Sequence, residues 1–309
     1  MFNYMCESSI TKEMNQPLLH VMIPAYGKSP YLRQTLESAA KYLPPEVPIT
    51  VIEDPSIDAN LESLVKGFPR VEYLRNSARL GIAGNFNECI NKSRGLFTQI
   101  CGSDDIFVSD PTAKISKELN SDLKVAVIGF DVSVIDKNNQ DVRALPDFVK
   151  RMLRPRIGKS KLFKNPKIFR NLMLGDWLYF PAIVWRTNLV REYKFSGDFH
   201  TAMDLDILIR LLGDDKQIAF INEKVLGYRR HDQSASSLYA KSIGRFEEEF
   251  KCHKNAIEVA RNKNWKAGVI LAQVALTVRL HAIMQSFLMV FSSPRSALKV
   301  LVKAISPIR

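Results

Sequence analysis

Paired carboxylates follow two apolar runs in the first third of this 309-residue chain. Glu53-Asp54 comes directly after Ile49–Ile52, and Asp104-Asp105 comes shortly after Phe97–Cys101. Two adjacent carboxylates behind a buried strand suit a hard divalent cation bound to phosphate, because Mg²⁺ and Mn²⁺ take only one or two protein carboxylates. Asp pairs are also common in turns, where Asp104-Asp105 would only cap the next segment. The residues alone leave both interpretations open.

A further acid stands at the start of an apolar segment later in the chain. Met203–Leu212 predicts a helix with Asp204 in its first turn, where the helix dipole stabilises a carboxylate. An ionised Asp that faces a cleft at such a position can act as general base for an acceptor hydroxyl. The alternative is a plain acid at the start of a surface helix, which the residues alone favour.

Apolar runs and helical patterns alternate through the first hundred residues, which must place these acids. We expect strands at 18–23, 49–52, 71–74 and 97–101, and helices at 30–42, 58–66 and 82–94. This alternation predicts a parallel sheet with right-handed crossovers, whose ligands bind outside the carboxyl ends of the strands. No G-x-G-x-x-G follows the first strand and no P-loop sequence occurs, which argues against a dinucleotide site or a P-loop.

Charge is distributed unevenly along the chain. Residues 1–150 carry 16 Lys/Arg and 19 Asp/Glu, a net charge of −3, whereas residues 151–309 carry 28 and 13, a net charge of +15. Residues 151–170 hold eight Lys/Arg and no acid. This segment could bind a lipid-linked pyrophosphate or an anionic leaflet, and the alternative is a solvated loop. We expect no nucleic-acid partner, because no nucleic-acid motif occurs and such a partner would not explain the acid pairs.

Cysteine usage and the N-terminus bear on the compartment. The four cysteines are widely scattered, which favours reduced thiols in the cytosol over disulfides or structural zinc. Residues 1–17 contain no apolar core of a secretory signal. We therefore expect a cytoplasmic protein, and peripheral contact with the inner face of the cell membrane stays open.

The last seventy residues have a helical pattern. Residues 268–291 are strongly apolar, yet polar side chains recur every four residues and form one stripe, namely Gln273, Thr277, His281 and Gln285 with Arg279 and Ser286. Such a stripe predicts an amphipathic helix rather than one that spans a bilayer. Two roles remain open: a core-packing helix that closes the domain, or a monotopic membrane helix.

Six short motifs, taken in order, resemble those of the family 2 glycosyltransferases of the GT-A fold. They are Ile23–Tyr26, Val51–Asp58, Leu80–Asn87 followed by Gly95, Ser103–Asp105, Asp204–Asp206 with Arg210-Leu211, and Tyr228–His231 followed by Ser234–Ser236. The resemblance covers about residues 18–238. Gly27, Gly102 and Met203 stand where the family usually has Asn, Asp and Glu.

The resemblance implies an α/β fold of the GT-A type, a Rossmann-like, mixed and mainly parallel sheet flanked by helices, with a C-terminal helical extension. It implies a glycosyltransferase domain at 1–238, whose nucleotide-sugar-binding half is 18–125 and whose acceptor half is 126–238. Residues 239–309 would then form the helical region, with membrane association left open.

The resemblance also implies roles for individual residues. Glu53 or Asp54 would contact the nucleotide base, and the donor pocket would include Pro24, Ala25, Tyr26 and Asn85. Asp104 would face the ribose or the donor sugar, and Asp105 would bind Mn²⁺ or Mg²⁺ on the diphosphate.

On the acceptor side, Asp204 would be the catalytic base, with Asp206 as its alternative because Met203 replaces the preceding acid. Arg230 and His231 would contact the diphosphate, although His231 as a simple surface histidine is an equal alternative.

The implied function is a non-processive, inverting glycosyltransferase of the bacterial surface-polysaccharide type. Its donor would be a nucleotide-diphosphate sugar, with a UDP-sugar favoured, and its acceptor a glycan or a lipid-linked saccharide. The alternative is a catalytically impaired protein that binds nucleotide sugars or polyanions, because Gly102 and Met203 depart from the family pattern.

Overall fold

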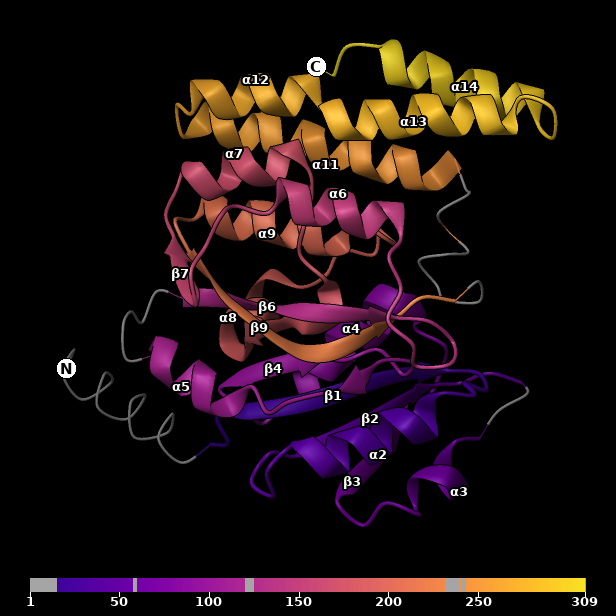
Figure 1. Ribbon diagram of the computed structural model, residues 1–309, viewed down its shortest axis with the longest axis vertical. Helices are drawn as coiled ribbons and strands as arrows, with labels where there is room; N and C mark the ends of the chain where they lie inside the picture. Colours follow the sequence, from indigo (N-terminus) through magenta and orange to yellow (C-terminus); the bar gives the residue numbers. More distant parts are fainter. Residues whose placement is uncertain (1–15, 58–59, 120–124, 232–238, 240–242, 309) are drawn as a thin grey trace. The chain divides into compact units, whose positions relative to one another are not determined.

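The computed structural model describes residues 16–57, 60–119, 125–231, 239 and 243–308 (Figure 1). The chain divides into two compact units, each made from several segments. Unit 1 contains residues 1–133, 179–194 and 221–229, and unit 2 contains residues 134–178, 195–220 and 230–309. This division differs from the expected boundary at 238/239, because the C-terminal helices share unit 2 with much of the expected acceptor half.

Unit 1 begins with the alternating elements that the sequence predicts. The strands are β1 (Leu19–Tyr26), β2 (Ile49–Asp54), β3 (Val71–Arg75) and β4 (Phe97–Ile100), and the helices between them are α2 (Leu32–Tyr42), α3 (Glu62–Val65) and α4 (Gly81–Lys92). All pairings among these four strands are parallel. The expected parallel sheet is confirmed. Residues 58 and 59, at the expected start of the second helix, lie outside the described residues.

The sheet continues beyond β4 with antiparallel strands. These are β8 (Ile183–Arg186), β6 (Val125–Ile135), β9 (Gln217–Arg229) and β5 (Ile106–Phe107), in the order β3-β2-β1-β4-β8-β6-β9-β5, and β7 (Ser160–Phe163) pairs with β9. Unit 1 also contains α5 (Thr112–Leu119), α8 (Thr187–Tyr193) and the short 3-10 helix η1 (Phe180–Ala182). The sheet is therefore mixed and mainly parallel over its first half, as expected.

The register of the first strands aligns the carboxyl ends that carry polar residues. Tyr26 lies opposite Asp54 and Ala25 lies opposite Glu53. β2 and β4 are buried along their whole length, as expected for parallel strands of a sheet that is covered on both faces. The acids that follow these runs therefore emerge at one edge of the sheet.

Unit 2 is dominated by helices. They are α6 (Leu145–Leu153), α7 (Lys167–Leu174), α9 (Met203–Gly213), α11 (Ile243–Asn262), α12 (Lys266–Val274), α13 (Leu276–Met289) and α14 (Pro294–Ile305). The long helix α11 packs against α9, α12, α13 and α14, and α7 packs against α9 and α12 (Figure 1). The basic segment 151–170 is thus largely the end of α6, β7 and the start of α7 rather than one solvated loop.

The apolar segment near the C-terminus forms two helices rather than the single one expected. Ala275 has a left-handed conformation, with φ of 42° and ψ of 46°, and separates α12 from α13. Within the described residues, 266–289 is the one helical stretch long and apolar enough to cross a membrane by length and composition.

Candidate active site

Asp54 at the end of β2 organises the start of α4. Its Oδ1 accepts hydrogen bonds from the backbone N–H of Leu80 at 2.8 Å and from Asn76 Nδ2 at 3.2 Å, and its Oδ2 accepts from the N–H of Gly81 at 3.0 Å. A carboxylate at this position satisfies N–H groups that the helix leaves unpaired and complements the helix dipole. Asp54 therefore clamps β2 to α4, and both of its oxygens are committed within the protein.

Asn85 belongs to the same clamp. Asn76 Nδ2 also donates to Asn85 Oδ1 at 3.0 Å, and Asn85 Nδ2 donates to the carbonyl oxygen of Ile52 at 3.4 Å. The third motif of the sequence is thereby tied to the second motif by side-chain hydrogen bonds. Asn85 is buried, so within unit 1 it supports the end of β2.

Glu53 is arranged differently from its neighbour. It is fully buried, and its Oε2 accepts from the Tyr73 hydroxyl at 2.6 Å and from the N–H of Leu61 at 2.9 Å. Its Oε1 accepts no hydrogen bond from the described residues, and the nearest cation is Arg75, whose Nε lies 3.7 Å away. Buried carboxylate oxygens are rarely left unpaired, so Glu53 rather than Asp54 has capacity for a donor group such as a base N–H.

The end of β1 presents one exposed side chain. Ala25 is buried and Pro24 is half-buried, whereas Tyr26 is exposed, and the guanidinium of Arg79 lies 4.6 Å from the centre of its ring. An exposed aromatic ring with an arginine stacked on it offers a flat surface and a positive charge. Tyr26 and Arg79 thus flank the clamp formed by Asp54, which is the expected position of the donor pocket.

Asp104 and Asp105 converge over Gly102. A Cβ atom at residue 102 would lie 2.6 Å from Asp104 Oδ1 and 2.7 Å from Asp105 Oδ2, so both carboxylates reach into the space left by the missing side chain. Burial, together with the charge of Asp104, raises the pKa of the Asp105 carboxyl well above its usual range. Two acids forced together in this way favour a bound cation between them.

The residues present fit a divalent metal ion. Two carboxylates are the number that Mg²⁺ or Mn²⁺ commonly takes from a protein when phosphate and water supply the other ligands. No group of three or more His, Cys, Asp or Glu side chains that could hold a metal occurs within the described part of the chain. The other ligands of an ion held by Asp104 and Asp105 would come from the donor diphosphate and from water.

Arg229, at the end of β9, holds both acids from the protein side. Its N–H donates to Asp105 Oδ1 at 2.9 Å, and its Nε donates to the carbonyl oxygen of Asp104 at 2.7 Å. Its guanidinium also binds Gln34 and lies 4.4 Å from the centre of the Tyr31 ring. Arg229 belongs to the motif Tyr228–His231 but was not predicted as a site residue. The Tyr-Arg pair of that motif is the sequence signal that could have indicated it.

Asp204 lies in the first turn of α9, as expected, and is buried. Burial and the negative charge of Asp176 raise its pKa to about 7, and the cation of Lys150 partly opposes this shift. A buried carboxylate with a pKa near neutrality is poised to exchange a proton at physiological pH. Asp176 and Lys150 were not predicted as site residues, because neither belongs to a motif and only the fold brings them to Asp204.

Asp206 is committed to structural contacts. Its Oδ2 binds Arg210 Nη2 at 2.8 Å, and its Oδ1 accepts from Asn255 Nδ2 at 3.3 Å. The ion pair joins residues one turn apart and stabilises α9, and the Asn255 hydrogen bond links α9 to α11. The pattern favours Asp204 over Asp206 as the carboxylate with a chemical role.

The start of α9 is held by Glu248 of α11. Glu248 accepts hydrogen bonds from the backbone N–H groups of Thr201 at 2.8 Å and His200 at 2.9 Å, and from the His200 ring at 3.0 Å. Burial alone would raise the pKa of Glu248, but these donors outweigh it and lower the pKa. A residue of the C-terminal helical region therefore positions the start of α9, whose first turn contains Asp204. No sequence motif indicates this role of Glu248.

Arg230 and His231 are in unit 2. The Arg230 guanidinium forms a two-point ion pair with Asp147 of α6, at 2.6 and 2.7 Å, so its charge is already paired within the protein. His231 is half-buried. The following residues of the motif, Ser234–Ser236, lie outside the described residues.

The aromatic residues of 177–185 mostly belong to the core. Trp177 and Trp185 are buried, and the Trp177 ring contacts Phe220 edge-on at 5.1 Å between ring centres. Phe180 stacks on Phe86 at 4.8 Å. Both tryptophans therefore pack in the core of the protein and present no ring face to solvent.

Comparison with known proteins bears out the class of fold. The S. aureus TarS fragment 1–349 in complex with UDP-GlcNAc superposes with a TM-score of 0.58 at 15% identity, over 92% of this chain and 89% of that one. The mannosyltransferase PcManGT of Pyrobaculum calidifontis, in complex with GDP-Man and Mn²⁺, superposes with a TM-score of 0.60 at 13% identity, over 94% and 80%. The fold is that of the GT-A glycosyltransferases.

Sequence comparison identifies the family. Residues 20–176 match the profile of glycosyl transferase family 2. An uncharacterized glycosyltransferase of Methanocaldococcus jannaschii is 22% identical over 70% of this chain and 72% of its own length. The chondroitin synthase of Escherichia coli is 28% identical over 66% of this chain but only 28% of its own length. The chain belongs to glycosyl transferase family 2 and is a glycosyltransferase.

Proposed function

We propose that this enzyme transfers a sugar, with inversion at the anomeric carbon, from a nucleotide-diphosphate sugar to a hydroxyl of a glycan or lipid-linked acceptor. The observation that carries the proposal is the convergence of Asp104 and Asp105 over Gly102, because two adjacent carboxylates suit a metal-bound diphosphate. TarS and PcManGT, in complex with UDP-GlcNAc and with GDP-Man and Mn²⁺, support this donor class. We favour a UDP-sugar.

The residues divide the work of the reaction. Asp104 and Asp105 would hold Mn²⁺ or Mg²⁺, which when bound neutralises charge on the diphosphate leaving group. Arg229 keeps both acids in place, and Glu53 offers its Oε1 to the nucleotide base. Asp204, when ionised, accepts the proton of the acceptor hydroxyl, which attacks the anomeric carbon from the face opposite the nucleotide.

The remaining assignments are proposed on the same basis. Residues 18–125 supply the donor half, 126–238 the acceptor half, and 239–309 a helical region. Arg230 and His231 contact the diphosphate, which for Arg230 requires exchange of its partner Asp147. The enzyme is non-processive, works in the cytoplasm and serves the synthesis of bacterial surface polysaccharide.

Donor binding tests this function. Calorimetric titration with UDP-, dTDP- and GDP-sugars, with and without Mn²⁺, should show one nucleotide class that binds in a metal-dependent way. Asp105→Ala should abolish this binding and the slow hydrolysis of the donor, whereas the matched substitution Asp110→Ala, at a neighbouring turn acid, should leave both unchanged. Metal-dependent binding without any hydrolysis or transfer would favour the impaired binding protein. Failure to bind every donor would refute the proposal.

A further inference from the structure

Helix α13 presents its apolar side chains outward. Six large apolar residues of α13 and the following turn have exposed fractions between 45% and 97%, namely Leu276, Leu280, Met284, Phe287, Leu288 and Phe291. Their spacing of three or four residues places them along one stripe of the helix. Monomeric soluble proteins rarely expose contiguous apolar surface of this kind without an interaction partner.

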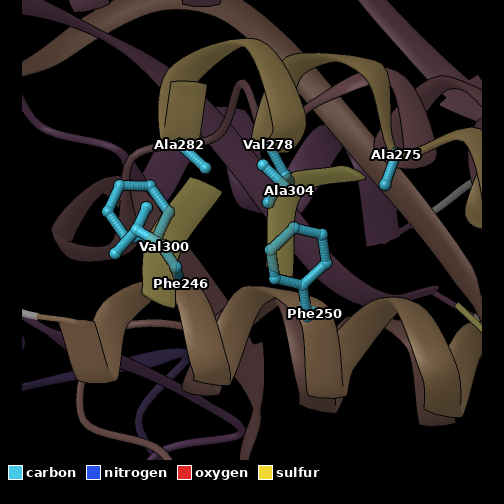
Figure 2. Packing of buried hydrophobic residues seen from close by; sticks show 7 residues of the cluster. All are labelled: Phe246, Phe250, Ala275, Val278, Ala282, Val300 and Ala304. Atoms are coloured by element: carbon cyan, nitrogen blue, oxygen red, sulfur yellow. The ribbon is translucent and has the colours of Figure 1, made fainter. Parts of the chain in front are cut away.

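The polar stripe of the same helix faces the protein. Thr277 Oγ1 donates to the carbonyl oxygen of Leu174 at 2.7 Å, the His281 ring contacts Phe246 at 5.1 Å, and Ser286 is buried. Small residues of α13 and α14 pack beside this stripe on Phe246 and Phe250 of α11 (Figure 2). The sequence left open whether this segment packs its apolar face into the core or onto a membrane. The large apolar side chains of α13 do not face the core.

Two further helices of unit 2 also expose large apolar side chains. Helix α14 exposes Leu298, Val302 and Ile305, and α6 exposes Leu145, Phe148, Val149 and Met152. Two charged residues of α6 have partners within unit 2: Asp147 pairs with Arg230, and Lys150 lies 4.0 Å from Asp176. The end of α6 and the start of α13 meet at Gly175, where a Cβ atom would lie 2.5 Å from Leu153 and 3.4 Å from Thr277.

Basic residues outnumber acids in the segments that contain these helices. Glu258 is the last acid of the chain, and the 51 residues after it contain eight Lys/Arg. No acid occurs between Asp147 and Asp176, a segment with nine Lys/Arg that includes half of α6. Arg295 and Lys299 are exposed beside the apolar stripe of α14. Basic residues around outward apolar side chains complement an anionic surface with an apolar interior.

We propose that the outward faces of α6, α13 and α14, together called the apolar face, bind the headgroup region of an anionic lipid bilayer. A second copy of the chain is disfavoured as the occupant, because two basic surfaces would meet. The helices lie on the membrane rather than cross it. Helix α11 runs along α12 and α13 and carries ionised residues, such as Glu247 and Lys251, that cannot enter hydrocarbon.

Vesicle co-sedimentation of the full-length chain tests the apolar face. The protein should sediment with vesicles of phosphatidylcholine and phosphatidylglycerol, less with phosphatidylcholine alone, and less at high salt. The triple variant Leu280→Gln, Met284→Gln, Leu288→Gln and the double variant Phe148→Gln, Met152→Gln should each bind about tenfold more weakly or worse, because apolar burial is lost. Arg295→Gln and Lys299→Gln should each weaken binding about fivefold.

Matched controls separate membrane binding from folding and from catalysis. Tyr42→Gln and Lys66→Gln replace exposed residues of unit 1 and should leave vesicle binding unchanged. Every variant should keep the thermal midpoint and the soluble donor hydrolysis of the wild type, so failure of the sugar-transfer proposal would leave this test intact. The proposal is overturned if the wild type ignores anionic vesicles at low salt or if the apolar-face variants bind as tightly. It is also overturned if the triple variant abolishes self-association measured by light scattering in a protein that binds no vesicles.

Discussion

Asp204 shows how the surroundings of one carboxylate set its chemistry. Its pKa of about 7 results from burial and from the charge of Asp176. Because a general base must be ionised, we expect the transfer rate to rise with pH through about 7 and to level off above it. Asp204→Asn should keep metal-dependent donor binding and lose transfer by about 10²–10⁴-fold. Rate measurements against pH, with donor titration of the variant, check this; a flat pH profile would contradict it.

Asp204 should also lower the free energy of unfolding at high pH. A folded-state pKa raised above the unfolded value means that the folded protein holds a proton that the unfolded chain releases. This penalty is absent below the unfolded pKa near 4 and grows until the pH exceeds about 7, where it reaches up to about 4 kcal/mol. Asp204→Asn should therefore raise the thermal midpoint at pH 8, and the gain should shrink at pH 5. An unchanged midpoint at both values would mean that burial costs Asp204 little.

Gly102 is the residue at which this chain departs from its family in the metal motif. The space above its Cα is filled by Asp104 Oδ1 and Asp105 Oδ2, so Gly102→Ala should displace both carboxylates while the fold adjusts. We expect the Mn²⁺ concentration needed for half-maximal donor hydrolysis to rise tenfold or more, with little change in thermal midpoint. Gly158→Ala, where an added Cβ meets nothing within 4 Å, is the matched control. An unaltered metal requirement would show that the two acids do not act together.

Single residues could be assigned from sequence only as far as their motifs reached. Asp54 lies at the end of β2, Asp105 lies in the turn after β4, and Asp204 lies in the first turn of α9, as their motifs predict. The sequence could not separate Glu53 from Asp54, because the distinction lies in their partners, which come from three other elements. Arg229 was passed over for a related reason, since its contacts with Asp104 and Asp105 join residues more than 120 positions apart.

At the scale of elements, α9 depends on α11 for its N-terminus. Glu248 accepts hydrogen bonds from two partly buried backbone N–H groups there, and its removal would take away this charged acceptor. Glu248→Ala should therefore lower the free energy of unfolding by about 2–3 kcal/mol. The neighbouring exposed pair Glu247–Lys303 provides the control, because Glu247→Ala should cost about 0–1 kcal/mol. Urea unfolding measures both, and equal effects would contradict a capping role for Glu248.

Acid should weaken this cap. The folded-state pKa of Glu248 is lowered, so its stabilising contribution is present above the unfolded pKa and is lost as the pH falls through the folded value. The contribution of Glu248 to stability therefore rises with pH, whereas that of Asp204 falls with pH, although both carboxylates lie near the start of α9.

Secondary structure was predictable where the pattern was long and regular. The strands and helices up to residue 101 follow alternating apolar runs, and α9 follows its own apolar face. The break at Ala275 was not predictable, because no Gly or Pro marks it and the left-handed residue is an alanine. The direction of the α13 stripe also escaped prediction, since periodicity defines two faces of a helix without saying which one the protein covers.

At the scale of the whole molecule, each of the two compact units combines segments that lie far apart in the sequence. Unit 2 draws on three separate segments, and the helical region after residue 239 belongs to it. The net charge of +15 after residue 150 indicates an anionic partner for this part of the chain, but charge alone does not distinguish a phosphate group from a lipid surface.

The path of α12 and α13 along α11 has a consequence for sidedness. If the apolar face binds a bilayer as proposed, the protein stays in one leaflet, because its apolar helices pack against a charged neighbour that cannot cross. Every group that it modifies would then lie on the side that supplies its donor. A lipid-linked product would then carry its new sugar toward the compartment in which nucleotide sugars are made. If that glycan is needed on the opposite side of the membrane, a separate transporter must turn the lipid over after this enzyme has acted.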